Sequence, residues 1–303
     1  MLPEGIYPVA PTPFDSDGAI DLESVGRIAS SLVDIGVQGI LVLGVMGEAD
    51  RLLDEERHAV LKRFVEAASG RVAIVAGTSH PSAYGARELT RIAEQIGADA
   101  VMVSPPRLAK PNLESVRSFY ETVASGSSIE IVVQDHPASS GVYMPPDFIA
   151  RLAADIPTVS AVKLEDPPTP PKISAVRSLT DNGLQVFGGL GGVAFLEELD
   201  RGAVGTMTGF AFPEVLIQIW QNHQAGNTEA ARRVFSDHLP LIQFEAQAFI
   251  SLAIRKLVYQ MRGIIKTDHL RAPAPQLDAR TIHELQTLIQ ELGLKVGEKV
   301  GSK

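Results

Sequence analysis

One lysine in this sequence stands where an amine could do covalent chemistry. Lys163 closes the apolar run Val159–Lys163, which has the composition of a buried β-strand. An ammonium group among apolar neighbours is desolvated, which favours the free amine that attacks a carbonyl carbon. The resulting imine draws electrons, so bonds to the neighbouring carbon can break or form. The other interpretation is a lysine that reaches solvent or pairs with Glu165 or Asp166, and position alone does not decide between the two.

Other motifs with catalytic meaning are weak. Gly189–Ala194 matches a G-x-G-x-x-A dinucleotide fingerprint, but it follows a late strand, so a tight turn between strand and helix explains it better. The histidines show neither H-x-x-x-H nor H-x-H spacing, so no metal site is expected, and the pair Asp135–His136 is the weak alternative. Neither a G-x-S-x-G elbow nor a G-x-x-x-x-G-K-[ST] loop occurs, which disfavours hydrolase and P-loop functions.

The elements that must position these residues repeat along the chain. Eight short runs are near-continuously apolar, as in parallel strands buried on both faces. They are Ile6–Ala10, Gly39–Leu43, Val72–Ala76, Ala100–Ser104, Ile129–Val133, Val159–Lys163, Leu184–Phe187 and Ala203–Thr208. Helical apolar spacing lies between them, as in Leu22–Ile35, Glu55–Ala68 and Ala83–Ile96. This α/β alternation predicts a closed (β/α)8 TIM barrel, and an open doubly wound sheet is the alternative.

The remainder of the chain, from residue 213 onwards, shows no convincing strand. Helical periodicity covers Gln218–Gln224, Thr228–Arg262 and Arg280–Leu292, with a linker-like break at Arg271–Pro275. We therefore predict a barrel over residues 1–212. The C-terminal helices, over residues 213–303, are expected to complete the barrel and extend it within one structural unit.

Composition argues against several classes of protein. The formal net charge is -9 at pH 7, which disfavours nucleic acid or an anionic membrane as the main partner. There is no cysteine, so neither disulfides nor thiolate chemistry can contribute. No apolar run approaches the roughly 18 residues of a membrane span, and the N-terminus lacks the basic and long apolar regions of a secretory signal. A cytoplasmic location is the default expectation.

Short motifs after the predicted strands carry a family resemblance. They are Thr12–Phe14 (T-P-F), Gly44–Glu48 (G-V-M-G-E), Pro137–Gly141 (P-A-S-S-G), Val162–Asp166 (V-K-L-E-D) and Gly202–Gly205 (G-A-V-G). In their order and spacing the chain resembles, over essentially its whole length, the dihydrodipicolinate synthase/N-acetylneuraminate lyase family of class I aldolases and lyases. The resemblance implies a TIM barrel, an imine on Lys163, no cofactor, and a homo-oligomer, either a dimer or a tetramer of paired dimers.

The sequence departs from the family pattern at the proton relay. The tyrosine that opens the family's Y-N-x-P motif is Gln134 here, and an amide can donate a hydrogen bond but cannot titrate. His136, two residues further along, is the candidate replacement, unless it is a rim histidine bonded to a backbone carbonyl. Gln134 and His136 are therefore the expected catalytic neighbours of Lys163.

The expected substrate-binding positions also differ from the family pattern. The two threonines of the family's G-T-T-G-E motif are Val45 and Met46, so a carboxylate would depend on the backbone N–H groups of Met46 and Gly47. The arginine that serves the synthase's second substrate falls near Ser139, and the segment after the fourth strand carries Arg107 instead of a tyrosine. The full expected set is Val45, Met46, Gly47, Arg107, Ser139, Gly188 and Met207.

These features predict a Schiff-base-forming lyase or aldolase that acts on pyruvate or another small 2-oxo acid, or an aldolase or dehydratase for 2-keto-3-deoxy sugar acids. True dihydrodipicolinate synthase activity is not expected, because losing one proton-transfer group typically costs about 10²–10⁴-fold in rate. The alternative is a barrel that binds a 2-oxo acid without turnover, as a sensor or regulatory subunit. The sequence does not choose among the 2-oxo acids.

Overall fold

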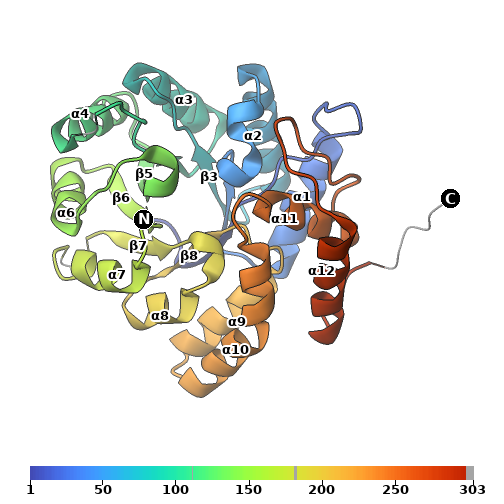
Figure 1. Ribbon diagram of the computed structural model, residues 1–303. Helices are drawn as coiled ribbons and strands as arrows, with labels where there is room; N and C mark the ends of the chain where they lie inside the picture. Colours follow the sequence, from blue (N-terminus) through green and yellow to red (C-terminus); the bar gives the residue numbers. More distant parts are fainter. Residues whose placement is uncertain (111, 181–182, 298–303) are drawn as a thin grey trace.

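The computed structural model describes residues 1–110, 112–180 and 183–297. Within these ranges, eight parallel strands form the centre of the molecule (Figure 1). They are β1 (Gly5–Pro8), β2 (Gly39–Val42), β3 (Ala73–Gly77), β4 (Ala100–Val103), β5 (Glu130–Asp135), β6 (Val159–Leu164), β7 (Gln185–Gly188) and β8 (Gly205–Thr208). Almost every strand residue is buried, because helices cover one face of each strand and the barrel interior covers the other.

The sheet closes on itself into a barrel. Each strand pairs in parallel with the next from β2 to β8, and β8 pairs with β1. Beyond β1, Val9 forms a parallel bridge with Leu41 of β2. The N–H of Ala10 also donates to the Leu41 carbonyl at 2.9 Å. The (β/α)8 barrel is therefore confirmed, and the open sheet is excluded.

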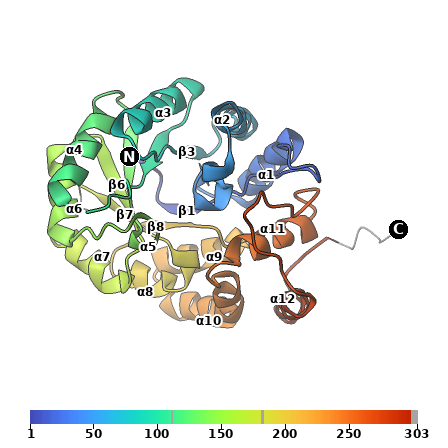
Figure 2. The ribbon, with the colours of Figure 1, turned by 45° about the horizontal axis from the view of Figure 1, so that its top comes forward.

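Helices surround the barrel in a ring (Figures 1 and 2). They are α1 (Leu22–Ile35), α2 (Asp54–Ala68), α3 (Ala83–Ile96), α4 (Leu113–Ala124), α6 (Pro146–Asp155), α7 (Thr169–Arg177), α8 (Phe195–Asp200) and α9 (Pro213–Gln224). The one-turn helix α5 (Pro137–Ser140) lies inside this ring, in the loop after β5 (Figure 2). In the described part of the chain, three 3-10 turns lie in the loops, η1 (Val45–Gly47), η2 (Ala49–Arg51) and η3 (Leu190–Gly192). Local signals set the bounds of α1: Asp21 accepts from the Ser24 N–H at 3.0 Å, and Gly36 ends the helix in the left-handed region.

Further helices gather beside the barrel near α9 and α1, namely α10 (Thr228–Glu245), α11 (Ser251–Met261) and α12 (Ala279–Glu291) (Figures 1 and 2). The helical periodicity over Thr228–Arg262 predicts one continuous helix, and this prediction is wrong. It is interrupted at residues 246–250, where Phe249 has a φ of 73°, a left-handed conformation that a right-handed helix cannot continue through. Residues 298–303 of the predicted extension lie outside the described residues, and its division from the barrel stays a prediction.

None of the helices in the described ranges has the length and apolar character needed to cross a membrane.

The barrel interior is filled by side chains from alternate strand positions, including Tyr7, Met102, Phe187 and Met207. The Tyr7 and Phe187 rings meet edge to face with their centroids 5.3 Å apart. Side chains alternate along a strand, so a residue two positions after one of these interior residues also points into the barrel. Such residues lie nearer the open carboxyl end, where active sites of these barrels are found.

One acidic side chain is buried in the helical layer. Glu198 of α8 accepts from Thr169 Oγ1 at 2.6 Å through Oε1, while its Oε2 has no hydrogen-bond partner among the described residues. Burial raises the pKa of Glu198 to about 7, although the Thr169 hydrogen bond opposes the shift. The folded pKa lies above the unfolded value, so the folded state binds more protons between the two. Stability should therefore fall as pH rises through this window.

Glu198→Gln is expected to remove this pH-dependent penalty. The substitution should raise the free energy of unfolding by about 2–3 kcal/mol more at about pH 8 than at about pH 5, because the amide carries no buried charge. Denaturant unfolding of both proteins at the two pH values measures the effect. An equal change at both values would show that Glu198 does not titrate in this range.

Candidate active site

Lys163 lies inside the barrel at the carboxyl end of β6. A register shift between Ile131 and Val132 of β5 brings Gln134 level with Lys163 on the neighbouring strand. The Lys163 side chain is only 6% exposed, and its Nζ lies 3.1 Å from Oε2 of Glu165. The amine is therefore sheltered from solvent and is also half of an ion pair, and its covalent role stays a prediction.

Glu165 connects the groups around this amine. Its Oε2 accepts from Gln134 Nε2 at 2.9 Å, and its Oε1 accepts from the Leu190 N–H at 3.3 Å. Gly189 leaves room for the carboxylate, since a Cβ there would lie 2.6 Å from Cγ of Glu165. Burial alone would raise the pKa of Glu165, but the Lys163 ammonium and the hydrogen bonds outweigh it and hold that pKa below its usual value. Glu165 is therefore an ionised base beside the amine.

A cavity of about 250 Å³ opens at the carboxyl ends of β2 to β5, and neither Lys163 nor Glu165 lines it. The loops after β2, β3, β4 and β5 line it, with residues that include Gly44, Val45, Ser79, Met102, Ser104 and Gln134. Gln134 belongs both to this wall and to the hydrogen-bonded group around Glu165. The volume suits a small ligand, and Gln134 joins the space to the amine.

The turn after β2 is the 3-10 turn η1. The Gly47 N–H donates to the Gly44 carbonyl at 2.9 Å, so it is used within the turn and is not offered to a carboxylate, contrary to the prediction. The Val45 and Met46 N–H groups come earlier in the turn, where N–H groups lack partners within the helix, so the Met46 N–H is a candidate donor for a ligand. Val45 is 64% exposed and lines the cavity.

A buried carboxylate fixes this turn. Glu48 has a φ of 51° and accepts from Lys256 Nζ at 2.6 Å, from Arg51 Nη1 at 2.8 Å and from the Arg271 N–H at 3.1 Å. The side chains of Glu48 and Lys256 are both fully buried, and the Lys256 ammonium lies 4.3 Å from the centre of the Phe14 ring. The helices after residue 250 therefore hold the turn that faces the cavity.

Ser139 lies at the edge of the cavity, and His136 reaches it only through contact with Ser139. His136 is half-buried directly before α5, and its Nδ1 lies 2.8 Å from Ser139 Oγ, which also contacts the His136 carbonyl at 3.1 Å. Ser139 lines the cavity. His136 helps electrostatically to lower the pKa of Glu165, but among the described residues it makes no hydrogen bond to Glu165 or Lys163. Its relay role stays a prediction.

Five of the seven expected substrate-binding residues, among them Met46 and Gly47 of η1, do not line the cavity formed by the described residues. Arg107 is exposed in the loop after β4. A Cβ on Gly188 would meet Glu198, so this position faces the helices, and the next residue, Gly189, faces the mouth instead. Met207 is fully buried within the barrel, below the mouth. A shift of one residue along a strand reverses its face, which is why Gly188 was the wrong glycine.

Two residues outside the expected set join the mouth. Glu165 is two positions after Lys163 on the same strand face, so the alternation of side chains could have identified it. Arg255 of α11 is 6% exposed, and its Nη1 lies 3.2 Å from the Met46 sulfur. A Cβ on Gly209 would lie 2.9 Å from the same nitrogen. No local pattern predicts Arg255, because it enters from a helix remote in sequence.

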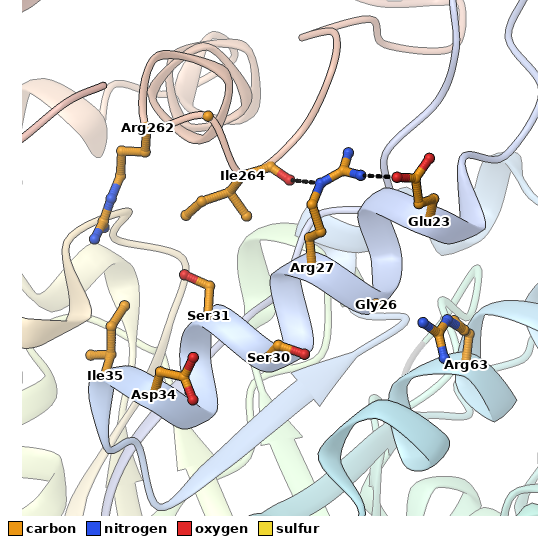
Figure 3. A pocket seen from close by; sticks show the side chains of 11 residues that line it. Glu23, Gly26, Arg27, Ser30, Ser31, Asp34, Ile35, Arg63, Arg262 and Ile264 are labelled. Atoms are coloured by element: carbon orange, nitrogen blue, oxygen red, sulfur yellow. Dashed lines mark hydrogen bonds and ion pairs between the residues drawn. The ribbon is translucent and has the colours of Figure 1, made fainter. Parts of the chain in front are cut away.

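A larger, open hollow of about 650 Å³ lies on the outer wall, between α1 and the residues after α11 (Figure 3). Its charged groups already have partners: Arg27 contacts Glu23 at 2.9 Å and the Ile264 carbonyl at 3.1 Å, and Arg262 contacts Glu214 at 2.8 Å. It shares no residue with the mouth cavity. The described residues also hold no cluster of three or more His, Asp or Glu side chains that could bind a metal. The groups suited to chemistry therefore concentrate at the barrel mouth.

Known proteins match the chain over nearly its whole length. The family model described as "Dihydrodipicolinate synthetase family" matches residues 2–292. L-2-keto-3-deoxyarabonate dehydratase of Azospirillum brasilense is 31% identical over 293 residues, which cover 95% of this chain and 94% of the relative. 4-Hydroxy-tetrahydrodipicolinate synthase of Methanococcus vannielii is 27% identical over 294 residues, which cover 96% and 99%.

The same family emerges from the solved structures. The crystal structure of dihydrodipicolinate synthase from Rhodopseudomonas palustris matches with a TM-score of 0.91 and 31% identity, and the match covers 96% of this chain and 99% of that one. The closed barrel, the motifs after its strands and the whole-length family match agree with one another. The chain belongs to the dihydrodipicolinate synthetase family.

Proposed function

We propose that this protein is a Schiff-base-forming lyase for a 2-keto-3-deoxy sugar acid, acting as a dehydratase or an aldolase. Lys163 is the nucleophile and Glu165 is the acid–base group. One observation carries the proposal: Glu165 Oε2 lies 3.1 Å from Lys163 Nζ and 2.9 Å from Gln134 Nε2. Gln134 stands where the family resemblance places a proton-relaying tyrosine, and the buried carboxylate supplies the acid–base function that an amide lacks.

Condensation at Lys163 is the first step. Glu165 takes a proton from the ammonium, and the freed amine attacks the C2 carbonyl of the substrate. Proton transfer within the adduct gives a neutral carbinolamine. Glu165 then returns its proton to the hydroxyl, which leaves as water, and a protonated imine remains. The substrate carboxylate accepts a hydrogen bond from the Met46 N–H.

The protonated imine makes the C3 hydrogens acidic. In dehydration, the Glu165 carboxylate takes one of them, and the enamine expels the C4 hydroxyl as water with the proton returned by Glu165. In aldol cleavage, Glu165 takes the proton of the C4 hydroxyl, the C3–C4 bond breaks, and its electrons form the enamine. Both routes need one acid–base group beside the imine, which is the arrangement at Lys163.

The relatives support an enzyme of this broad type. One relative, at 31% identity, is an L-2-keto-3-deoxyarabonate dehydratase. The synthase reaction is less well matched, because Gln134 and Ser139 stand where the resemblance places the synthase's tyrosine and, nearby, its arginine. We therefore favour 2-keto-3-deoxy sugar acids as the substrate class.

A panel of five- and six-carbon 2-keto-3-deoxy aldonates and aldarates is expected to contain a substrate. Mass spectrometry would detect dehydration as loss of water, and a coupled assay would detect cleavage as released pyruvate. The synthase reaction, run as the control, should show a kcat/KM lower by at least about 10²-fold, since its tyrosine is absent. Turnover confined to the synthase reaction would contradict the proposal. Binding of 2-oxo acids without any turnover would indicate a non-catalytic barrel instead.

A further inference from the structure

We infer that Arg255 forms a second anion-binding subsite at the barrel mouth, where it binds a carboxylate at the end of the substrate remote from the imine. The inference rests on the proposed imine chemistry at Lys163. It narrows the substrate class to 2-oxo acids that carry two carboxylates, such as 2-keto-3-deoxy aldarates.

The Arg255 guanidinium is buried with few acceptors. The residue is 6% exposed, and the acceptor of Nη1 is the thioether of Met46 at 3.2 Å. Its Nε has no hydrogen-bond partner among the described residues, and its ion-pair contact to Glu245 Oε2 is long, at 3.5 Å. A guanidinium has five N–H donors and sulfur is a weak acceptor. The fork formed by Nη1 and Nη2 can therefore still donate hydrogen bonds to an oxygen ligand.

Glycines bring this fork to the mouth between the ends of β7 and β8. A Cβ on Gly209 would lie 2.9 Å from Nη1, and a Cβ on Gly191 would lie 3.1 Å from Nη2. Gly209 is two residues beyond Met207, which points into the barrel interior, so it faces the open end. The charge of Arg255 also interacts with that of Glu165, the proposed base. The guanidinium is therefore close enough to the proposed base, Glu165, for the two charges to attract each other.

The charge around Arg255 favours an anion. Burial raises the pKa of Glu245 to about 7, although Arg255 and the hydrogen bond from the Ala211 N–H oppose the shift. Glu245 therefore neutralises Arg255 only in part at neutral pH. A planar guanidinium pairs with a carboxylate through two parallel hydrogen bonds, which a neutral hydroxyl cannot match. Met46 is half-buried and has three rotatable bonds, so its thioether can give way to such a ligand.

The test compares 2-oxoglutarate with 2-oxopentanoate, which has the same carbon chain but one carboxylate. The half-saturating concentration of each acid is measured by borohydride trapping of the imine. Arg255→Met is expected to raise the value for 2-oxoglutarate by at least about 30-fold, while that for 2-oxopentanoate changes by less than about threefold. Arg255→Lys, which keeps the charge but not the fork, should lie between wild type and Arg255→Met. Equal changes for both acids would overturn the inference.

Arg57→Met is the matched control, because Arg57 is the guanidinium that lines the mouth cavity. Loss of the preference for 2-oxoglutarate in Arg57→Met but not in Arg255→Met would overturn the assignment. If Arg255→Met fails to fold, Arg255→Lys carries the comparison. If the wild type forms no adduct with either acid or with pyruvate, the imine proposal fails. Calorimetric titration with 2-oxoglutarate then decides the inference, since unchanged binding in the Arg255 variants contradicts it.

Discussion

Replacing Lys163 with alanine is expected to lower kcat by at least about 10⁴-fold, because every covalent intermediate depends on its amine. Two other lysines of the described chain, the partly buried Lys172 and the buried Lys256, are engaged away from the cavity. Lys172 contacts Asp135 at 2.6 Å, and Lys256 contacts Glu48 at the same distance. Neither can take over the nucleophilic role. Steady-state kinetics on the purified variant measures the loss.

Lys172→Met is the matched control for this variant, since it also removes a buried, ion-paired lysine. It is expected to lower the melting temperature, because Asp135 and Asp166 lose their shared partner, yet it should still form the imine. Retention of more than about a hundredth of wild-type kcat in Lys163→Ala would exclude Lys163 as the nucleophile.

Glu165→Gln is expected to lower kcat by about 10²–10⁴-fold. The amide keeps the size of the side chain but cannot accept the proton at C3 or return it to a leaving hydroxyl. The imine should still be trapped, more slowly, so the loss of turnover should exceed the loss of adduct. Glu165→Asp keeps the carboxylate on a shorter side chain and should recover part of kcat. A Glu165→Gln variant within a few-fold of wild type would remove Glu165 from the acid–base role.

The pH dependence of activity distinguishes proton transfer by Glu165 from proton transfer by His136. Because its pKa lies below the usual 4.5, Glu165 stays ionised through the neutral range, and it is protonated only as pH falls through that lowered value. Activity that depends on Glu165 should therefore persist at mildly acidic pH and be lost below about pH 4.5. An inflection at higher pH that is absent in His136→Gln would assign the relay to His136 instead.

The fold could be predicted from the sequence because its signals are local and repeated. Strands buried on both faces require near-continuous apolar runs, and a run such as Gly39–Leu43 matches β2 to within one residue. The helix α1 matches its predicted bounds, because an acidic N-cap and a C-terminal glycine stand at its two ends. The break at Phe249 escaped prediction, since a left-handed phenylalanine has no composition signal of its own.

The site was only partly predictable. Lys163 was recognisable from its place near the end of a strand and Gln134 from the family resemblance, and strand pairing brings the two level. Glu165 follows from strand alternation once Lys163 faces inward, but a charged residue after a lysine also suits a solvated ion pair. Arg255 depends on the path of α11 over the barrel. No repeating pattern in the sequence indicates that α11 reaches the ends of β7 and β8.

The most direct test is to incubate the protein with pyruvate, reduce it with borohydride, and map the adduct by peptide mass spectrometry. We predict one pyruvyl modification, on the peptide that contains Lys163, and its absence from the Lys163→Ala protein. A wild-type protein that remains unmodified at saturating pyruvate, or an adduct that persists in Lys163→Ala, would contradict it.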